Sequence, residues 1–420
     1  MPDQGTRLRL PGPTAALARL SHRLEGHPQA RAIVHRSADR ALRDLARLGL
    51  DLNALRIRPG VPAPAGTSIH SIPVRPAQLV AVRRPVAAFD LEPAGVAGLA
   101  ERISRGYSRP ADCLLELGGG RFELPSGFIS LGGRLPSQAI PFLYFPHGHN
   151  LLPALRCLYG RATTVGDGIL IHLPLAWSYY HWLCEVLPRA LIAAAHAPEL
   201  PLYLNDKLPP FVFESLRHLG LHDRCVRLPA GVYEARRLLA MSFERAEWPV
   251  PEDLLRIRDG LAALAEPAVK PGGEAPARRR ILISRADAID RRTANEDQLL
   301  DELSDLGFER VSLTGLSLAQ QVRLFSVADM VVAAHGAGLT NLLFAPAHCR
   351  VVEIAVESHL GPTYQILTSL LGQRYGYVRG EEHRRDVWVD PGGVRTVLGA
   401  LDQPAPADGM AAGGALTWPS

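Results

Sequence analysis

The second half of this chain alternates short apolar runs with amphipathic stretches, and no other feature limits its possible folds as strongly. Apolar runs at 280–284, 310–313, 330–334 and 350–354 predict strands, and the stretches between them have helical spacing. Parallel strands need such helical crossovers. The pattern therefore predicts a doubly wound parallel sheet of the α/β class, with a ligand crevice at the carboxyl ends of its strands.

Two of the intervening stretches carry the residue spacing of a capping box at the start of a helix. The pairs and their helices are Thr293 and Glu296 before residues 296–306, and Ser317 and Gln320 before residues 318–327. Gly307 is expected to end the first of these helices. A short helix is also expected after the strand at 330–334, ending before Pro346.

The first half contains a similar pattern. Residues 169–173 predict a strand, 178–195 a helix that is broken or kinked at Pro188, and 201–204 a second strand. Short strand-like pieces over residues 113–132 predict a hairpin. The chain is thus expected to hold two Rossmann-like units.

Stretches rich in proline and glycine indicate where these units begin and end. The length agrees with more than one unit, since 420 residues exceed what one average core needs. The expected segments are a helical N-terminal extension and linker at 1–110, a first lobe at 111–270, a second lobe at 271–402 and a flexible tail at 403–420.

Composition argues against several classes of protein. No run of roughly 18 apolar residues occurs and the start lacks a secretory pattern, so a cytoplasmic protein is expected. The five cysteines are far apart and odd in number, which disfavours a disulfide framework or a local metal knuckle. Aromatic content is 6% and basic residues do not interleave with aromatics, so no nucleic-acid partner is expected.

Arginines recur on one predicted helix of the N-terminal extension, where Ala38, Leu42, Leu45 and Ala46 have helical spacing. They are Arg36, Arg40, Arg43 and Arg47. Such a face could contact anionic lipid at the inner side of a membrane, as would suit an enzyme with a membrane-linked acceptor. A solvated outer face is the other interpretation.

The run from Met330 to Asn341 indicates a buried strand, a glycine turn and the start of a helix. Backbone N–H groups at a helix start have no intrahelical partners, and the helix dipole adds positive potential there. Gly336 and Gly338 let a diphosphate approach the backbone and permit a positive φ. The segment predicts a site for the phosphates of a nucleotide or sugar nucleotide, although an ordinary loop would share the pattern.

Arginines follow the first strand of the same predicted sheet. Arg285, Arg291 and Arg292 lie in the loop after Ser284, at the edge that also carries His335. Guanidinium groups bind phosphate oxygens bidentately, so these side chains could hold the same diphosphate. Arginines on a solvated loop are the alternative.

The first half has its own polar motif, in which His181 and Glu185 are four residues apart on one helical face. A carboxylate beside an imidazole holds its tautomer and raises its basicity, as a general base for an acceptor hydroxyl requires. One histidine and one glutamate supply too few ligands for a metal site. A structural histidine between Tyr180 and Trp182 is equally compatible with the motif.

Together, these motifs resemble the glycosyltransferase 61 family from about Ser178 to Glu353. The resemblance rests on Tyr180, His181, Trp182, Leu183, Glu185, Leu187, Pro188, Arg189, Ile283, Ser284, Arg285, Arg292, Asn295, Glu296, Gln321, Ala328, Asp329, the run His335 to Asn341, Phe344 and Glu353. Ser178 departs from the family pattern, which usually has asparagine there, and this leaves open a hydrogen bond near His181.

The resemblance implies a GT-B fold of two Rossmann-like lobes, with a nucleotide-sugar donor on the C-terminal lobe and a glycan or lipid-linked glycan acceptor in the cleft. It also implies inversion in a single displacement, with His181 and Glu185 as the catalytic pair. The expected donor-binding residues are Arg285, Arg292, Asn295, His335, Gly336, Ala337, Gly338, Asn341 and Glu353. Glu353 could accept hydrogen bonds from the donor ribose or cap the next helix.

The sequence contains no Asp-x-Asp triplet, so a metal-independent reaction without a cofactor is expected. Surface polysaccharide synthesis is the expected pathway, because bacterial members of the resembling family are often linked with it. A non-catalytic nucleotide- or carbohydrate-binding scaffold of a polysaccharide assembly complex is the alternative. A nicotinamide-dependent oxidoreductase is disfavoured, since no Gly-x-Gly-x-x-Gly turn with a following acidic residue is found.

Overall fold

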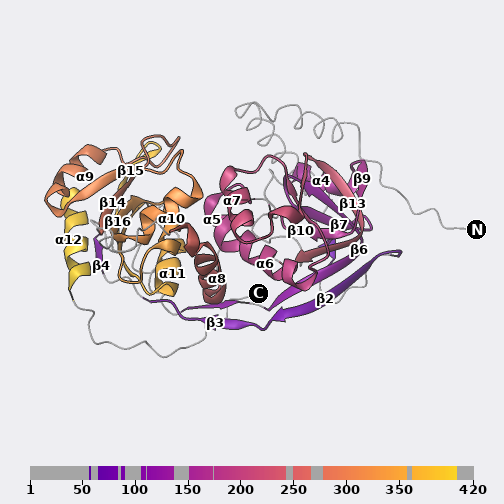
Figure 1. Cartoon of the computed structure of the whole chain (residues 1–420). Coiled ribbons are helices and arrows are strands. Elements are labelled where there is room, and N and C mark those ends of the chain that lie inside the picture. The colour runs from indigo at the N-terminus through magenta and orange to yellow at the C-terminus, as the bar shows by residue number, and fades with distance from the viewer. Residues whose placement is uncertain are drawn as a thin grey trace, which may run out of the picture.

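The computed structural model describes ten stretches of the chain. They are residues 56–57, 65–83, 87–89, 106–109, 111–136, 151–173, 175–242, 249–265, 278–356 and 362–403. The predicted arginine-bearing helix of the N-terminal extension and residues 404–420 lie outside them. Two β-sheets organise the described part, a parallel sheet on the left of Figure 1 and a mixed sheet on the right.

The parallel sheet has six strands that all run in the same direction. Their order is β15 (Phe308–Ser312), β14 (Arg279–Ser284), β16 (Ala328–Ala334), β17 (Arg350–Ala355), β18 (Arg374–Arg379) and β4 (Ala87–Phe89). The four strands expected from the apolar runs are therefore confirmed. Strand order reverses between β14 and β16, so their carboxyl ends, at Ser284 and Ala334, flank the position where α/β sheets bind ligands.

Helices cover both faces of the parallel sheet, because consecutive residues of a strand point to opposite sides. Val332 packs with α9 (Glu296–Glu302) and α12 (Pro391–Asp402), while Val331 packs with the opposite layer. That layer consists of α10 (Leu318–Ser326), η9 (Ala337–Phe344) and α11 (Thr363–Leu370). A short 3-10 turn, η8 (Ser304–Leu306), and the hairpin of β19 (Glu381–His383) with β20 (Asp386–Trp388) complete this region.

The capping predictions had different outcomes. Ser317 and Gln320 form a capping box at α10, as expected. The capping box predicted for Thr293 and Glu296 was wrong. The N-cap of α9 is Asn295, and the Glu296 side chain accepts a hydrogen bond from Ser284 Oγ at 2.7 Å. The Glu296 carboxylate therefore binds Ser284, at the end of β14, instead of the backbone at the start of α9.

The helix end at Gly307 is confirmed, and its backbone adopts the left-handed conformation, with φ of 71°. This residue follows η8 rather than α9 itself, so the expected helix over 296–306 is divided into an α-helix and a 3-10 turn.

The mixed sheet departs from the expected Rossmann-like arrangement. Its path is β12 (Cys225–Leu228), β11 (Leu202–Asn205), β10 (Gly168–Leu170), β13 (Gly231–Met241), β6 (Asp112–Leu124) and β2 (Ser68–Arg75), with β7 (Phe128–Leu131) on β6 and β9 (Ala162–Val165) on β13. Strands β12, β11, β10 and β13 are parallel, but β6 is antiparallel to β13, β2 and β7. Only the part of this sheet that consists of β12, β11, β10, β13 and β9 is parallel, as expected.

The hairpin expected over 113–132 is confirmed as β6 and β7. The three glycines at 118–120 lie within β6 rather than in a turn, and β6 runs on for 13 residues because ten residues of β13 pair with it.

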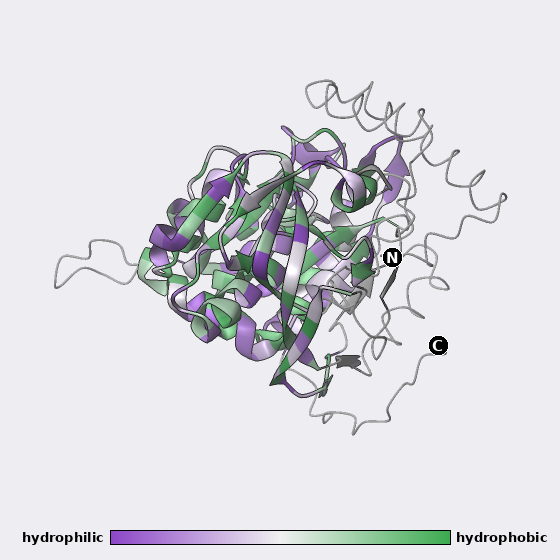
Figure 2. Cartoon of the chain, turned by 90° about the vertical axis from the view of Figure 1, so that its right-hand side faces the viewer, coloured by the Kyte–Doolittle hydropathy of each residue, from purple (hydrophilic) through white to green (hydrophobic). Residues whose placement is uncertain are grey.

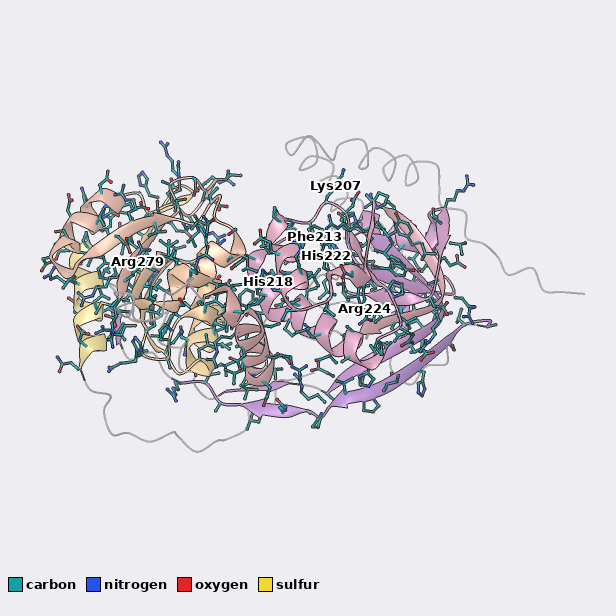
Figure 3. All side chains as sticks on the ribbon, viewed as in Figure 1. Lys207, Phe213, His218, His222, Arg224 and Arg279 are labelled. Atoms are coloured by element: carbon teal, nitrogen blue, oxygen red, sulfur yellow. The ribbon has the colours of Figure 1, made fainter. Side chains whose placement is uncertain are left out.

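One face of the mixed sheet carries the helices of the first half. They are α5 (Tyr179–His181), the π-helix η5 (Trp182–Val186), α6 (Leu187–His196), α7 (Pro210–His218) and α8 (Pro251–Leu261), with 3-10 turns η6 (His222–Arg224) and η7 (Ala262–Leu264). Helix α4 (Leu151–Tyr159) packs on β6 and β7. Arg224, labelled in Figure 3, donates to the carbonyls of Ala194, Ala197 and Leu200 at the end of α6.

The expected break at Pro188 was wrong, because the helical segment continues through it. The irregularity lies just before, where the Leu187 N–H bonds to the Trp182 carbonyl in π-helical register. Proline has no N–H to donate, and it is tolerated at the first positions of a helix. Here Pro188 occupies such a position at the start of α6.

The described residues before position 110 form strands, whereas the helical prefix expected at the start of the chain lies almost wholly outside the described residues. Strand β2 joins the edge of the mixed sheet, while β4 closes the edge of the parallel sheet beside β18. Between them, β3 (Gln78–Val80) pairs with β5 (Tyr107–Arg109), and β1 (Arg56–Ile57) pairs with β8 (Leu135–Pro136). Figure 1 shows β2 and β3 running beneath the molecule from one sheet region toward the other. The predicted boundary at residue 110 therefore cuts through both sheets.

One hydrophobic cluster joins the two sheet regions. It contains Ile169 of the mixed sheet, Leu183 of η5, and Ile283 and Leu339 of the parallel-sheet region. The long strands of the mixed sheet, which face the viewer in Figure 2, show hydrophobic and hydrophilic residues in turn along their length. Within the described part of the chain, no helix has both the length and the hydropathy needed to cross a membrane.

Candidate active site

The expected pairing of His181 with Glu185 is present. Nδ1 of His181 lies 2.8 Å from Oε2 of Glu185, one turn further along the helix. The His181 side chain is 21% exposed, whereas that of Glu185 is 3% exposed. The carboxylate is therefore buried behind the imidazole, and the ring has its Nε2 atom available for other contacts.

The π-helix places this pair on a rigid support. Helices rarely contain π turns, and those that occur are frequently found at functional sites. The fully buried Trp182 anchors η5 by donating from Nε1 to Ser215 Oγ of α7 at 2.8 Å. Tyr179 of α5 donates from its hydroxyl to Asn341 Oδ1 of η9, also at 2.8 Å. Ser178 is the N-cap of α5 but makes no side-chain capping bond.

A second histidine–carboxylate pair lies in the parallel-sheet region. His335 follows β16, and its Nδ1 atom is hydrogen-bonded to Oε1 of Glu353 on the neighbouring strand β17. The Tyr375 hydroxyl donates to the other oxygen of Glu353 at 2.7 Å from β18. Glu353 is 1% exposed and His335 is 18% exposed, so this pair repeats the burial pattern of the first.

Aromatic rings connect the two pairs. The Tyr364 ring of α11 meets the His335 ring edge-on, with centroids 5.2 Å apart. The same ring meets Tyr180 edge-on at 6.0 Å, and Tyr180 contacts the adjacent His181. Burial raises the pKa of both tyrosines, so both hydroxyls stay protonated. His335 thus faces its partners and Tyr364, and it is not enclosed by hydrocarbon.

The guanidinium of Arg285 covers the glycine turn. A Cβ atom at position 336 would collide with Nη1 of Arg285, so only glycine lets the arginine lie this close to the backbone. Arg285 donates from Nε to the Arg291 carbonyl and from Nη2 to the Asp290 carbonyl. Among the described residues, Nη1 has no hydrogen-bond acceptor, and the Arg285 side chain is only 17% exposed.

Arg291 lies close to Arg285, and both lie near the carboxylate of Asp290. Asp290 is 3.9 Å from Arg285 and 3.7 Å from Arg291, longer than direct hydrogen bonds. Burial, and then the adjacent Arg291 charge, lowers the pKa of Arg285. Arg291 has a left-handed backbone, with φ of 56°, which is unusual for a residue other than glycine. The two guanidiniums thus lie side by side without a direct hydrogen bond to the Asp290 carboxylate, an arrangement that could bind an anion.

Arg292 differs from the expectation of a donor contact. Its guanidinium forms a two-pronged pair with the Asp386 carboxylate of β20, and its side chain is 49% exposed. The interpretation that Arg292 reaches the diphosphate is therefore not supported by its position. The strained backbone at Arg291 directs successive side chains to different partners.

Asn295 and Asn341 were expected to contact the nucleotide-sugar donor, but both are bonded to other parts of the protein. Asn295 is buried and exchanges hydrogen bonds with the backbone of Val389, through Nδ2 at 2.8 Å and Oδ1 at 3.1 Å. Asn341 is fully buried, accepts from Tyr179 and donates to Gln321 Oε1 at 2.8 Å. Amides at a strand-to-helix turn can serve either a ligand or the scaffold, and their spacing does not distinguish the two.

Glu353 does not fit either role expected for it. Both of its oxygens are engaged by His335 and Tyr375, and it is enclosed within the sheet. It therefore neither faces a ribose nor caps a helix.

The glycine turn also differs in its details. Gly336 is extended, with φ of 171°, and Gly338 is not among the glycines of positive φ, so the expected left-handed turn is absent. The expected helix after it is a 3-10 helix, η9, which starts at the half-buried Ala337. The glycines are needed for space, since a Cβ at Gly338 would press on Leu313 at 3.0 Å.

The family model that matches this chain is described as Glycosyltransferase 61, and the match covers residues 179–352. Residues 179–352 form a glycosyltransferase 61 domain. Both histidines and Arg285 lie within that span. The family resemblance of the sequence motifs is therefore confirmed.

Curated relatives match over shorter stretches. A beta-1,2-xylosyltransferase of Oryza sativa subsp. japonica is 36% identical over 90 residues, which are 21% of this chain and 14% of that protein. An alpha-1,3-arabinosyltransferase of the same organism is 32% identical over 101 residues, which are 23% of this chain and 16% of that protein. The chain thus matches only a small part of the length of these relatives.

A solved structure, E. coli heptosyltransferase WaaC with ADP, covers 56% of this chain and 97% of its own. The sequence identity is 12% and the TM-score is 0.31, a likeness too low to carry an argument about this protein.

Three residues at the site of the glycosyltransferase 61 domain were not selected from the sequence as binding or catalytic residues. Tyr364 and Tyr375 lie beyond the matched span and carry no motif, so no sequence signal identified them. Arg291 was recognised only as one of three arginines in its loop, and Arg292 beside it was preferred. Among the described residues, no group of three or more His, Cys, Asp or Glu side chains is placed to hold a metal ion.

Proposed function

We propose that this protein is an inverting glycosyltransferase that moves a sugar from a nucleotide-sugar donor to a hydroxyl group of a glycan or lipid-linked glycan. The observation that supports it best is that two histidine–carboxylate pairs are connected through Tyr180 and Tyr364. His335, with Glu353, contacts Tyr364 directly, and His181, with Glu185, contacts Tyr180, which in turn meets Tyr364.

On the acceptor side, His181 is the general base. Glu185 fixes its Nδ1 atom, so Nε2 is the nitrogen that meets the acceptor hydroxyl. As the hydroxyl oxygen attacks the anomeric carbon, its proton passes to Nε2. The bond between the anomeric carbon and the phosphate oxygen breaks at the same time, and its electron pair leaves with the diphosphate.

On the donor side, Arg285 and Arg291 hold the diphosphate together with backbone N–H groups at the start of η9. Negative charge on the leaving diphosphate grows during the reaction, and guanidinium groups with low exposure stabilise it more than in water. These arginines supply the positive charge that a divalent ion provides elsewhere, so we propose a metal-independent reaction of GT-B type.

The names of the two plant relatives mention xylosyl and arabinosyl transfer, which makes pentose donors the first to examine. Synthesis of a surface polysaccharide, and a cytoplasmic location with peripheral membrane contact, remain proposals from the sequence. The arginines on which the membrane contact rests lie outside the described residues.

The proposal is tested by incubating the purified protein with nucleotide sugars that include UDP-xylose, UDP-arabinose and common hexose donors. We expect slow hydrolysis of one donor without an acceptor, and faster release of nucleoside diphosphate with a suitable glycan. His181→Ala should lower kcat by about two to four orders of magnitude while leaving the donor KM within about twofold.

His196→Ala provides the matched control, because His196 is an exposed histidine at the end of α6 with no part in the site. Binding of a donor without turnover in the wild type would favour the non-catalytic scaffold. Full activity in His181→Ala would remove the assignment of the base.

A further inference from the structure

We propose that Glu353 and Tyr375 are positioning residues that hold His335 as a direct contact for the diphosphate of the donor. This inference rests on the proposed function. The inference adds a chain of hydrogen bonds to the proposed function. This relay, Tyr375–Glu353–His335, crosses three adjacent strands or strand ends of the parallel sheet.

The relay is continuous from strand to strand. Tyr375 of β18 donates from its hydroxyl to Oε2 of Glu353 at 2.7 Å, and Glu353 of β17 accepts at Oε1 from Nδ1 of His335. The three residues belong to neighbouring strands or their ends, because β16 pairs with β17 and β17 with β18. The His335 N–H also bonds to the Ile354 carbonyl at 2.9 Å, which fixes the backbone of the histidine.

The relay determines which nitrogen of His335 is available. Because the carboxylate occupies Nδ1, that atom carries a proton, and Nε2 is the nitrogen with no partner among the described residues. The neighbouring residue is Gly336, over which the Arg285 guanidinium lies. Nε2 is therefore the ring nitrogen that the relay leaves for a ligand.

Tyr375 satisfies the second oxygen of a carboxylate that water does not reach. A buried carboxylate oxygen without a donor is costly, so the hydroxyl keeps Glu353 in its position. Burial, followed by the nearby Glu353 charge, raises the pKa of Tyr375 well above its usual value, which keeps the hydroxyl protonated as a donor.

Within the described part of the chain, the groups around His335 come from several elements. Glu353 comes from β17 and Tyr375 from β18, while Tyr364 comes from α11. Arg285 and Arg291 come from the loop after β14. The carboxylates of Asp290 and Asp287 also act on Arg285. Nη1 of Arg285 still has no acceptor among the described residues, and a diphosphate oxygen would supply one.

The experiment measures the Kd of a nucleoside diphosphate by calorimetry. The probe is whichever of UDP, ADP, GDP and CDP raises the melting temperature of the wild type most. We expect Tyr375→Phe to weaken its binding about fivefold to tenfold, because the ring stays packed while the carboxylate loses its donor. In a His335→Ala background, the same change should have no further effect, since Tyr375 acts only through the imidazole.

Tyr233→Phe is the matched control. Tyr233 is also a buried strand tyrosine whose hydroxyl donates one hydrogen bond, to the Pro229 carbonyl, but it lies in the mixed sheet away from the site. Its replacement should leave the Kd unchanged.

The outcomes separate the relay from the function on which it rests. If the wild type binds the probe but Tyr375→Phe binds as well as Tyr233→Phe, the relay is wrong and the proposed function stands. If Tyr375→Phe weakens binding equally with and without His335, the tyrosine acts on the fold rather than on the imidazole, and the proposal fails. If the wild type binds none of the four diphosphates, the donor site itself is wrong.

Discussion

The protein contains the same chemical pair twice, built in two different ways. His181 and Glu185 belong to one helical segment and are joined across a single turn. His335 directly follows β16 and Glu353 lies on the next strand, β17, and a whole 3-10 helix separates them in sequence. Both glutamates are almost fully buried and both imidazoles are partly exposed.

The difference lies in what surrounds each imidazole. Near His181, Arg189 donates to the backbone carbonyl of Glu185 at 2.8 Å. His335 instead adjoins a glycine turn covered by Arg285, with Arg291 close by. The two arginines beside the glycine turn suit contact with an anion, which is the use proposed for His335.

The largest effect is expected from replacing the two carboxylates by amides of the same shape. Glu185→Gln should lower kcat about a hundredfold with little change in donor Kd, because the base loses the group that fixes its tautomer. Glu353→Gln should instead raise the donor Kd and leave kcat at saturation within a few fold. Steady-state kinetics with direct binding measurements distinguish the two.

Equal losses of kcat in both variants would contradict the division between a catalytic pair and a binding pair. Circular dichroism and melting curves of each variant show whether a buried amide has simply disturbed the fold.

A third histidine, buried without a carboxylate, sharpens the comparison. His172 donates from Nε2 to the Pro125 carbonyl, and burial lowers its pKa to about 4. The folded state therefore resists the proton that the unfolded chain binds below about pH 6.5, so stability falls as pH drops from about 6.5 toward 4. The loss should reach about 2 kcal/mol at pH 5.

Urea unfolding of the wild type and His172→Gln at pH 7 and pH 5 measures this effect. The glutamine side chain can keep a donor for Pro125 but does not titrate, so the variant should lose less stability on acidification. An identical loss in both proteins would show that other groups cause the acid sensitivity.

The smallest effect is expected from replacing Arg291 or Arg292, which are adjacent in sequence but have different partners. Arg291→Ala should weaken nucleoside diphosphate binding about tenfold, the usual order for one charge-assisted hydrogen bond. Arg292→Ala should change it less than about twofold, because that guanidinium is paired with Asp386 at the surface. The reverse order would return Arg292 to the donor site and remove Arg291 from it.

Much of the parallel sheet could be predicted from the sequence, because each of its central strands is a separate apolar run between helices. The six residues of β17 differ from the prediction by one residue at the end. Strand β4 could not be predicted, since its three residues become a strand only by pairing with β18. Strand β6 was predicted in pieces, because its three glycines disfavour a strand until β13 pairs with them.

The site was predictable where its contacts are local. The spacing of His181 and Glu185 already predicts their contact, because residues four apart meet on a helix. The partner of His335 was named, but for another role, since only the register of β16 and β17 brings Glu353 to it. Asn295 and Asn341 fit the family pattern whether their amides hold the protein together or contact a ligand. The sequence does not distinguish these two roles.

Strand β4 also has a consequence for how the chain acquires its structure. A ribosome makes it long before β18, the neighbour it needs, so this edge of the sheet cannot close until almost all of the described chain has been synthesised. Closing such a long loop costs conformational entropy before the contacts between the two strands can stabilise it. Proteins with many contacts between distant residues fold slowly. The last step of folding is therefore expected to be the docking of this early segment, and until then the flank of β18 is open to pairing with another nascent chain.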